Sequence, residues 1–154
     1  MLGFVKILGR DLIGRRRIHD NLPGIRTAVL VPVYNEDPVR VSAAIDAMAQ
    51  GLGSQAPGNF HFFILSDSND PGAWINEERV FSRLVTERDD HCPVYYRHRR
   101  DNRERKAGNI ADWVQRWGGG YQAMLVLDAD SIMSPATMVE MARRLEAEPG
   151  LGLL

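Results

Sequence analysis

Short apolar runs rich in β-branched and aromatic residues alternate along the chain with longer segments whose apolar residues recur at helical spacing. The short runs predict strands over residues 27–33, 60–65, 94–96 and 124–127, and residues 151–154 predict the beginning of a fifth. The longer segments predict helices over residues 38–51, 74–88, 106–117 and 135–148. This alternation predicts an α/β fold with a mostly parallel sheet and helices on its faces.

Polar side chains follow the predicted strands. Right-handed crossovers place the carboxyl ends of parallel strands at one edge of the sheet, where ligands bind. The polar residues expected at that edge are Asn35, Glu36 and Asp37, Ser66 to Asn69, the segment from Arg97 onward, and Asp128 and Asp130. Three of the four predicted strands therefore bring carboxylates to one crevice, with a basic segment beside them.

Asp128 and Asp130 are the candidate metal ligands, because they stand one residue apart directly after an apolar strand. Carboxylate oxygens suit hard ions such as Mg²⁺ or Mn²⁺. A metal bridging such a pair to a diphosphate would stabilise the charge that develops on a departing nucleoside diphosphate. The alternative is that the two aspartates only form a turn or cap a helix.

Two further groups of residues suit a nucleoside. Tyr34, Asn35 and Glu36 could stack on a nucleobase and bond to it. Asp67 could bind a base or ribose, or it could serve only as a turn former. Asp37 and Asp70 are each followed by proline, and both are interpreted as helix N-caps.

Residues 97–106 (RHRRDNRERK) are strongly basic and lead into the start of a helix. Such a run is often a solvated loop or a nucleic-acid-binding patch. Its place at the ligand edge, and the free N–H groups of a helix start, favour phosphate instead. Lys106 could neutralise a diphosphate, and Gly108 would permit a close backbone approach.

Composition narrows the class of protein. With 154 residues, 44% of them apolar, the chain can form one domain with a two-layer core. A formal net charge of −1 excludes a uniformly basic protein that coats nucleic acid, and no nucleic-acid partner is expected. The single cysteine, Cys92, indicates a reducing environment. Cys92 and His61 are interpreted as structural, and His19, His91 and His98 as exposed.

Membrane contact is expected to come from outside the predicted domain, residues 27–154. No apolar stretch approaches the ~18 uncharged residues of a transmembrane helix. Residues 1–26 form a juxtamembrane-like arm, in which an apolar stretch precedes Arg15, Arg16 and Arg17. Such an arm could rest on an anionic membrane surface, or it could be simply solvated.

Four segments, in this order and spacing, resemble the family 2 glycosyltransferases of the GT-A fold. They are residues 31–36 (VPVYNE), 66–68 (SDS), 106–109 (KAGN) and 128–130 (DAD). The resemblance implies a Rossmann-like, nucleotide-sugar-binding half of a GT-A domain. It further implies UDP-glucose as the sugar donor, a divalent metal, and inverting transfer to a growing glucan acceptor. The implied product is the β-linked backbone of osmoregulated periplasmic glucans, made at the cytoplasmic face of the bacterial inner membrane.

The resemblance also assigns roles to individual residues by motif. Tyr34, Asn35, Glu36 and Asp67 would hold the uridine, Lys106 and Asn109 the diphosphate side, and Asp128 and Asp130 the ribose and the metal, with Asp130 as the direct metal ligand.

Other parts of the family pattern are missing. The catalytic base that deprotonates the acceptor is expected beyond Leu154, as are the Gln-x-x-Arg-Trp-type motif and the membrane helices. We therefore expect the chain to be a truncated, donor-binding piece of a larger transferase, inactive alone.

The alternatives are a cellulose- or chitin-synthase-like member of the same family, a nucleotidyltransferase, and a regulatory or nucleic-acid-binding module that uses residues 97–106. A nucleotidyltransferase would need a glycine-rich loop after the first strand, and residues 33–38 contain no glycine.

Overall fold

The computed structural model describes residues 22–88, 91–148 and 150–152. In chain order the elements are β1 (Thr27–Val33), α1 (Pro38–Gln55), β2 (Phe60–Ser66), α2 (Pro71–Glu87), β3 (Val94–His98), α3 (Arg105–Trp117), the 3₁₀ turn η1 (Gly118–Gly120), β4 (Ala123–Val126) and α4 (Pro135–Ala147). Most of the arm predicted for residues 1–26 lies outside the described residues. Of the fifth strand predicted at residues 151–154, the two described residues are not in a strand.

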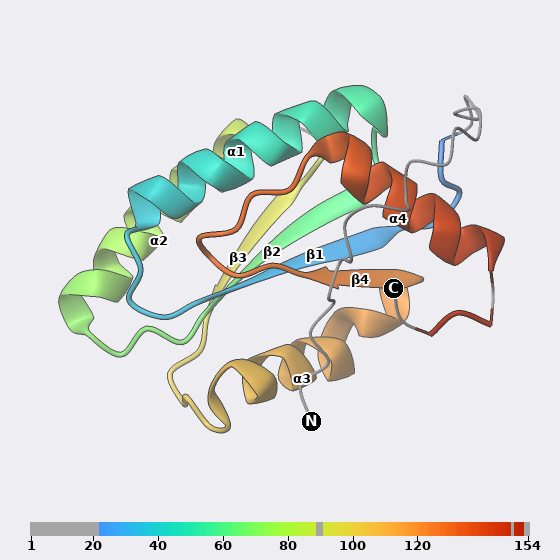
Figure 1. Ribbon diagram of the computed structural model, residues 1–154. Helices are drawn as coiled ribbons and strands as arrows, with labels where there is room; N and C mark the ends of the chain where they lie inside the picture. The colour runs from blue at the N-terminus through green and yellow to red at the C-terminus, as the bar shows by residue number, and fades with distance from the viewer. Residues whose placement is uncertain (1–21, 89–90, 149, 153–154) are drawn as a thin grey trace.

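The four strands form one sheet in the order β3-β2-β1-β4, and every pairing is parallel. Helices α1, α2 and α4 cover one face of the sheet and α3 covers the other (Figure 1). The predicted α/β class and parallel sheet are therefore confirmed. All four strands run in the same direction, so their carboxyl ends meet at a single edge.

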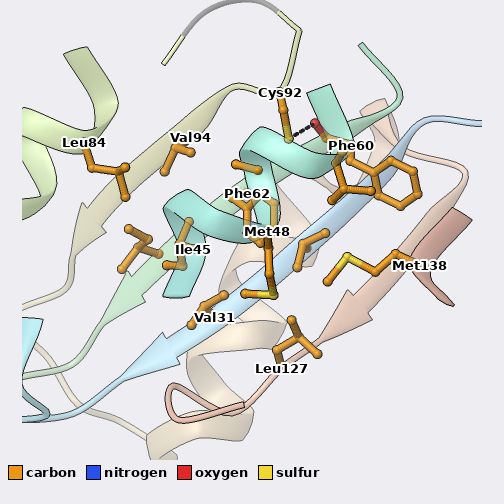
Figure 2. Close-up of a cluster of buried hydrophobic side chains, with 14 of the residues drawn as sticks. Val31, Ile45, Met48, Phe60, Phe62, Leu84, Cys92, Val94, Leu127 and Met138 are labelled. Carbon is orange, nitrogen blue, oxygen red and sulfur yellow. Dashed lines mark hydrogen bonds between the residues drawn. The ribbon is translucent and has the colours of Figure 1, made fainter. Parts of the chain in front are cut away.

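The larger core lies between the sheet and the three helices on its first face. Val31, Phe62, Ile45 and Met48 meet there with almost no exposed surface (Figure 2). Cys92 belongs to this core, and its thiol donates to the carbonyl oxygen of Phe60 at 3.3 Å. The interpretation of Cys92 as structural is confirmed.

The smaller core lies under α3 on the opposite face. Trp113 is its largest buried side chain and packs with Leu30 and Leu65 from the sheet. Within the part of the chain that the structure describes, α3 is the one helix on this face, and Tyr95 and Met124 beside it are exposed.

Three helices begin where the sequence predicts a cap. The side chains of Asp37, Asp70 and Ser134 each accept a backbone N–H of the first turn, and each is followed by proline at the first helical position. The predicted end of α1 at Gly51 is wrong, because the helix continues to Gln55. A Cβ at Gly51 would lie 2.5 Å from Cγ of Pro135, so this glycine permits close packing of α1 on α4.

The third strand is longer than the apolar run predicts. Arg97 and His98 continue it, because they pair with Leu65 and Ser66 of β2. The basic run therefore begins inside the sheet. Residues 99–104 form the turn that leads into α3, and Arg105 and Lys106 begin that helix.

Candidate functional site

A cavity of about 780 Å³ lies at the carboxyl edge of the sheet, where β1, β2 and β4 end and α3 begins. Its lining residues are Pro32, Val33, Tyr34, Glu36, Asp67, Asn102, Arg105, Lys106, Asp128, Ala129 and Asp130. Six of the eight residues singled out from the sequence are among them, namely Tyr34, Glu36, Asp67, Lys106, Asp128 and Asp130. The volume is in the range of pockets that bind small ligands.

The Asp128-Ala129-Asp130 segment directs two carboxylates to the cavity. Ala129 is buried in the main core at 8% exposure, whereas the aspartates on either side of it are exposed. Asp128 forms an ion pair with the ammonium group of Lys106, at the beginning of α3. The end of β4 and the beginning of α3 are thereby joined by opposite charges inside one cavity.

The donor set of Asp128 and Asp130 suits a metal that is shared with a phosphate. Among the described residues, no group of three or more His, Cys, Asp and Glu side chains is arranged to hold a metal ion. Mg²⁺ commonly binds through one or two carboxylates, and substrate phosphates and water complete its coordination. Two carboxylates in one cavity meet that requirement, although they would not enclose an ion by themselves.

Asp67 lies at the end of β2 and is 4% exposed. Its two oxygens accept from Arg99, with Nε at 2.8 Å from Oδ1 and Nη2 at 2.9 Å from Oδ2. This bidentate pair raises the pKa of Arg99 above its ordinary value, chiefly through the hydrogen bond to Asp67. Arg99 Nη2 also donates to the carbonyl oxygen of Arg103, at 3.1 Å. Asp67 is therefore held against the turn that leads into α3.

The turn after β1 carries Tyr34, Asn35 and Glu36. Tyr34 is 48% exposed and lines the cavity, and its backbone N–H donates to the Glu36 carboxylate. Asn35 has a φ of 59° in the left-handed region, and its backbone N–H donates to Ser68 Oγ at 2.8 Å. Asn35 is not among the cavity-lining residues, so the structure gives it a role in the shape of the turn.

Asn109 lies beneath the beginning of α3 and is fully buried. Its Nδ2 donates to the carbonyl oxygen of Leu65 at 3.0 Å, and its Oδ1 accepts from Arg97. The structure does not bring Asn109 to the cavity together with Lys106. Its amide fixes the helix on the sheet.

The beginning of α3 differs from the beginnings of the other three helices. Its N-cap residue, Glu104, has a φ of 59° and makes no side-chain capping bond. Arg105 and Lys106 of the first turn line the cavity. Gly108 permits close contact with the preceding turn, because a Cβ there would lie 2.3 Å from the carbonyl oxygen of Arg103.

The basic run does not form a single free patch. Arg97 pairs with Asp112, Arg99 with Asp67, and Arg103 lies 3.6 Å from Asp101. The expectation that His98 is exposed is wrong. Its ring is partly buried and stacks on Trp74, with centroids 5.4 Å apart.

Several proteins of known name are similar in sequence to this chain. The chain is 50% identical over 130 residues to a protein of Vibrio cholerae serotype O1 (strain ATCC 39541 / Classical Ogawa 395 / O395), covering 84% of this chain and 18% of the relative. A protein of Shewanella sp. (strain ANA-3) is 48% identical over the same shares. One of Caulobacter vibrioides (strain NA1000 / CB15N) is 44% identical over 161 residues, covering 100% of this chain and 24% of the relative. All three are named glucans biosynthesis glucosyltransferase H. The chain is homologous to a segment of glucans biosynthesis glucosyltransferase H.

The match covers a small part of each glucans biosynthesis glucosyltransferase H, because the chain spans 18% to 24% of the length of these relatives. No family model matches the chain. The crystal structure of protein Rv1636 from Mycobacterium tuberculosis H37Rv aligns with a TM-score of 0.37 at 13% identity, covering 87% of this chain and 96% of that one. A likeness of that size carries no conclusion. Within residues 22–88, 91–148 and 150–152, no helix is long and apolar enough to cross a membrane.

Three residues near the site were not singled out individually from the sequence. They are Arg99, which forms an ion pair with Asp67, Arg105, which lines the cavity, and Glu77 of α2, which is fully buried. The two arginines lie in the basic run, but the run alone does not say which cations face the cavity. Glu77 stands four residues before Phe81 and seven before Leu84, on the buried face of its helix. That spacing was the only feature of the sequence that could have indicated the burial of Glu77.

Proposed function

We propose that this chain is the part of a UDP-glucose-dependent glucosyltransferase of glucan biosynthesis that binds the sugar nucleotide. The observation that carries the proposal is the meeting of Lys106, Asp128 and Asp130 in one cavity at the carboxyl edge of the sheet. The name of the homologous proteins, glucans biosynthesis glucosyltransferase H, supports the class of reaction and the kind of product.

The diphosphate lies at the beginning of α3 in this proposal. Lys106 and Arg105 supply positive charge there, and the N–H groups of an uncapped helix start add to it. Asp128 and Asp130 would hold a divalent ion, Mg²⁺ or Mn²⁺, that the diphosphate would also bind. The ion would stabilise the negative charge on the departing UDP.

The nucleoside lies toward the ends of β1 and β2. The exposed ring of Tyr34 offers a surface for stacking on uracil. Glu36 and Asp67 offer carboxylate oxygens to the imide N–H and to ribose hydroxyls, which are donors. Arg99 uses one position on each Asp67 oxygen, and each oxygen retains a second lone pair for the nucleoside.

We assign the chemical step to groups outside this chain. Inverting transfer needs a base at the acceptor hydroxyl, and we place that base beyond Leu154 in the full-length protein. The growing glucan would meet the sugar at the open side of the cavity. We place the full-length protein at the cytoplasmic face of the inner membrane, attached through regions outside this chain.

The test is calorimetric titration of UDP into the full-length protein with and without Mn²⁺. We expect binding that depends on the metal, and we expect Asp130→Ala to abolish that dependence because one of two carboxylate ligands is lost. Asp101→Ala is the matched control, since Asp101 is an exposed aspartate that does not line this cavity. UDP binding that is equally strong without metal, or unchanged in Asp130→Ala, would overturn the proposal.

A further inference from the structure

Glu77 is a carboxylate buried at 0% exposure in the middle of α2. None of the described basic residues forms an ion pair with it. Both of its oxygens accept from serine hydroxyls at the end of β2, Oε2 from Ser66 at 2.5 Å and Oε1 from Ser68. Burying a carboxylate costs free energy, so a residue kept there in ionisable form calls for an explanation.

The two serines flank Asp67, and each also accepts a hydrogen bond from a backbone N–H. Ser66 Oγ accepts from the backbone N–H of Ser68 at 3.2 Å, and Ser68 Oγ accepts from the backbone N–H of Asn35 at 2.8 Å. A hydroxyl has one proton to donate. Because each proton points to Glu77, the lone pairs of both oxygens are left for the backbone.

This network reaches the cavity from two sides. On one side it fixes the chain on either side of Asp67, whose own N–H donates to the carbonyl oxygen of Val33 at 2.9 Å. On the other side it holds Asn35 at its positive φ, and with it the turn that carries Tyr34 and Glu36. Glu77 does not line the cavity, but three of the lining residues depend on the loops that it ties together.

We propose that Glu77 is a positioning residue for the nucleoside end of the cavity, acting through the Ser66 and Ser68 hydroxyls on Asp67 and on the turn at Asn35. The proposal rests on the proposed function, because the nucleoside is the ligand that these residues would hold.

Glutamine is the informative replacement because it keeps the shape of the side chain and supplies only one acceptor oxygen. Its amide nitrogen would face one of the serine oxygens, which already accepts a backbone N–H. That hydroxyl then loses its acceptor in a buried place, and the bond to the loop weakens. The buried hydroxyl of Tyr96 has no hydrogen-bond partner among the described residues, and burial and the charge of Glu77 raise the pKa of Tyr96 to about 12.

The experiment measures UDP affinity by calorimetry with Mn²⁺ in the full-length protein. We expect Glu77→Gln to weaken binding about tenfold, the loss expected from one disturbed charge-assisted hydrogen bond. The matched control is Glu78→Gln, the neighbouring exposed glutamate on the same helix, which should bind as the unaltered protein does. Hydrogen exchange at the amides of Asn35 and Ser68 should be faster in Glu77→Gln and unchanged in Glu78→Gln.

A second variant, Ser68→Ala, covers the case in which Glu77→Gln does not fold. It keeps the carboxylate, removes the link to Asn35, and is expected to weaken UDP binding by a similar factor. Where both variants fold, the double variant should bind no more weakly than Glu77→Gln alone. Failure of the unaltered protein to bind UDP overturns the proposed function, and the positioning role with it. If the unaltered protein binds UDP and a folded Glu77→Gln binds it equally well, the positioning role alone is overturned. Where only Ser68→Ala folds, equally strong UDP binding by that variant has the same consequence.

Discussion

The ion pairs of single residues at the cavity differ in what they can contribute to stability. Lys106 and Asp128 are 43% and 62% exposed, and an exposed pair of this kind is worth about 0–1 kcal/mol. The side chains of Arg99 and Asp67 are only 16% and 5% exposed, and their contact is bidentate. The first pair therefore contributes little to folding, which fits residues kept for a ligand, whereas the second pair fixes the geometry of the β2 end.

The pKa of His61 is lower in the folded protein than in the unfolded chain, so His61 makes stability depend on pH. Burial, and next the charge of Arg26, lower its pKa below the ordinary value of 6.5. The folded state thus favours the neutral ring, and the unfolded chain binds the proton first as the pH falls. The free energy of unfolding should therefore decrease as the pH falls below about 6.5, continuing down to the lower pKa of the folded state.

Urea unfolding of the protein at about pH 7.5 and about pH 5.5 tests this linkage. We expect a smaller difference between the two midpoints in His61→Gln than in the unaltered protein. The ring also meets the Tyr121 hydroxyl at 2.9 Å, so the variant should be less stable at both pH values. An equal difference between midpoints in both proteins would contradict the assignment to His61.

Among the helices, α3 depends most on close packing at its first turn. It starts without a side-chain cap, and both its N-cap residue Glu104 and its first residue Arg105 have a positive φ. The turn before the helix folds back on Gly108, where any side chain would meet the carbonyl oxygen of Arg103. The position of Lys106 relative to Asp128 is set by this arrangement.

Gly108→Ala should therefore destabilise the protein by about 2 kcal/mol, as overpacking does, and displace the beginning of α3. Gly119→Ala is the control, because a Cβ there meets no atom within 4 Å and its φ is compatible with alanine. Its free energy of unfolding should change by about 0.5 kcal/mol or less. Denaturant unfolding measures both variants, and equal stabilities would show that the turn moves away at no cost.

Local patterns were sufficient to predict most elements, and non-local contacts explain the failures. Three helix starts were predictable from Asp37, Asp70 and Ser134, because each capping residue is followed directly by proline in the sequence. Gly51 looks like a helix end, and only its contact with Pro135 of α4 shows otherwise. Similarly, the strand at Arg97 is visible only from its pairing with β2.

The same distinction holds for the candidate site. Parallel strand ends and the position of Asp128 and Asp130 were enough to predict which residues share the edge. Asn109 has a suitable side chain for phosphate, but its burial depends on Leu65 and Arg97. Glu77 is a charged residue in an amphipathic helix, and its burial depends on two serines that precede the helix.

At the scale of the whole molecule, the cavity is assembled from segments that lie far apart in the sequence. Its lining comes from three strand ends and one helix start, spread from Pro32 to Asp130. A ligand that binds there contacts only the folded state, so its binding free energy adds to stability.

UDP with Mn²⁺ should accordingly stabilise the full-length protein, by about 2.7 kcal/mol at a concentration a hundredfold above the dissociation constant. Thermal unfolding measures this as a rise in Tm. Asp130→Ala should lose the part of the rise that requires the metal, and Asp101→Ala should keep it. A rise of equal size in the presence of a chelator would argue against a metal shared with the diphosphate.

The strand order has a consequence for how the protein is made. β1 lies in the interior of the sheet, between β2, which follows it closely, and β4, which is synthesised last of the four strands. During translation one side of β1 stays open from the time β2 docks until residues 123–126 have left the ribosome. An open apolar strand edge can pair with other chains, so the nascent polypeptide is most exposed to aggregation in this interval.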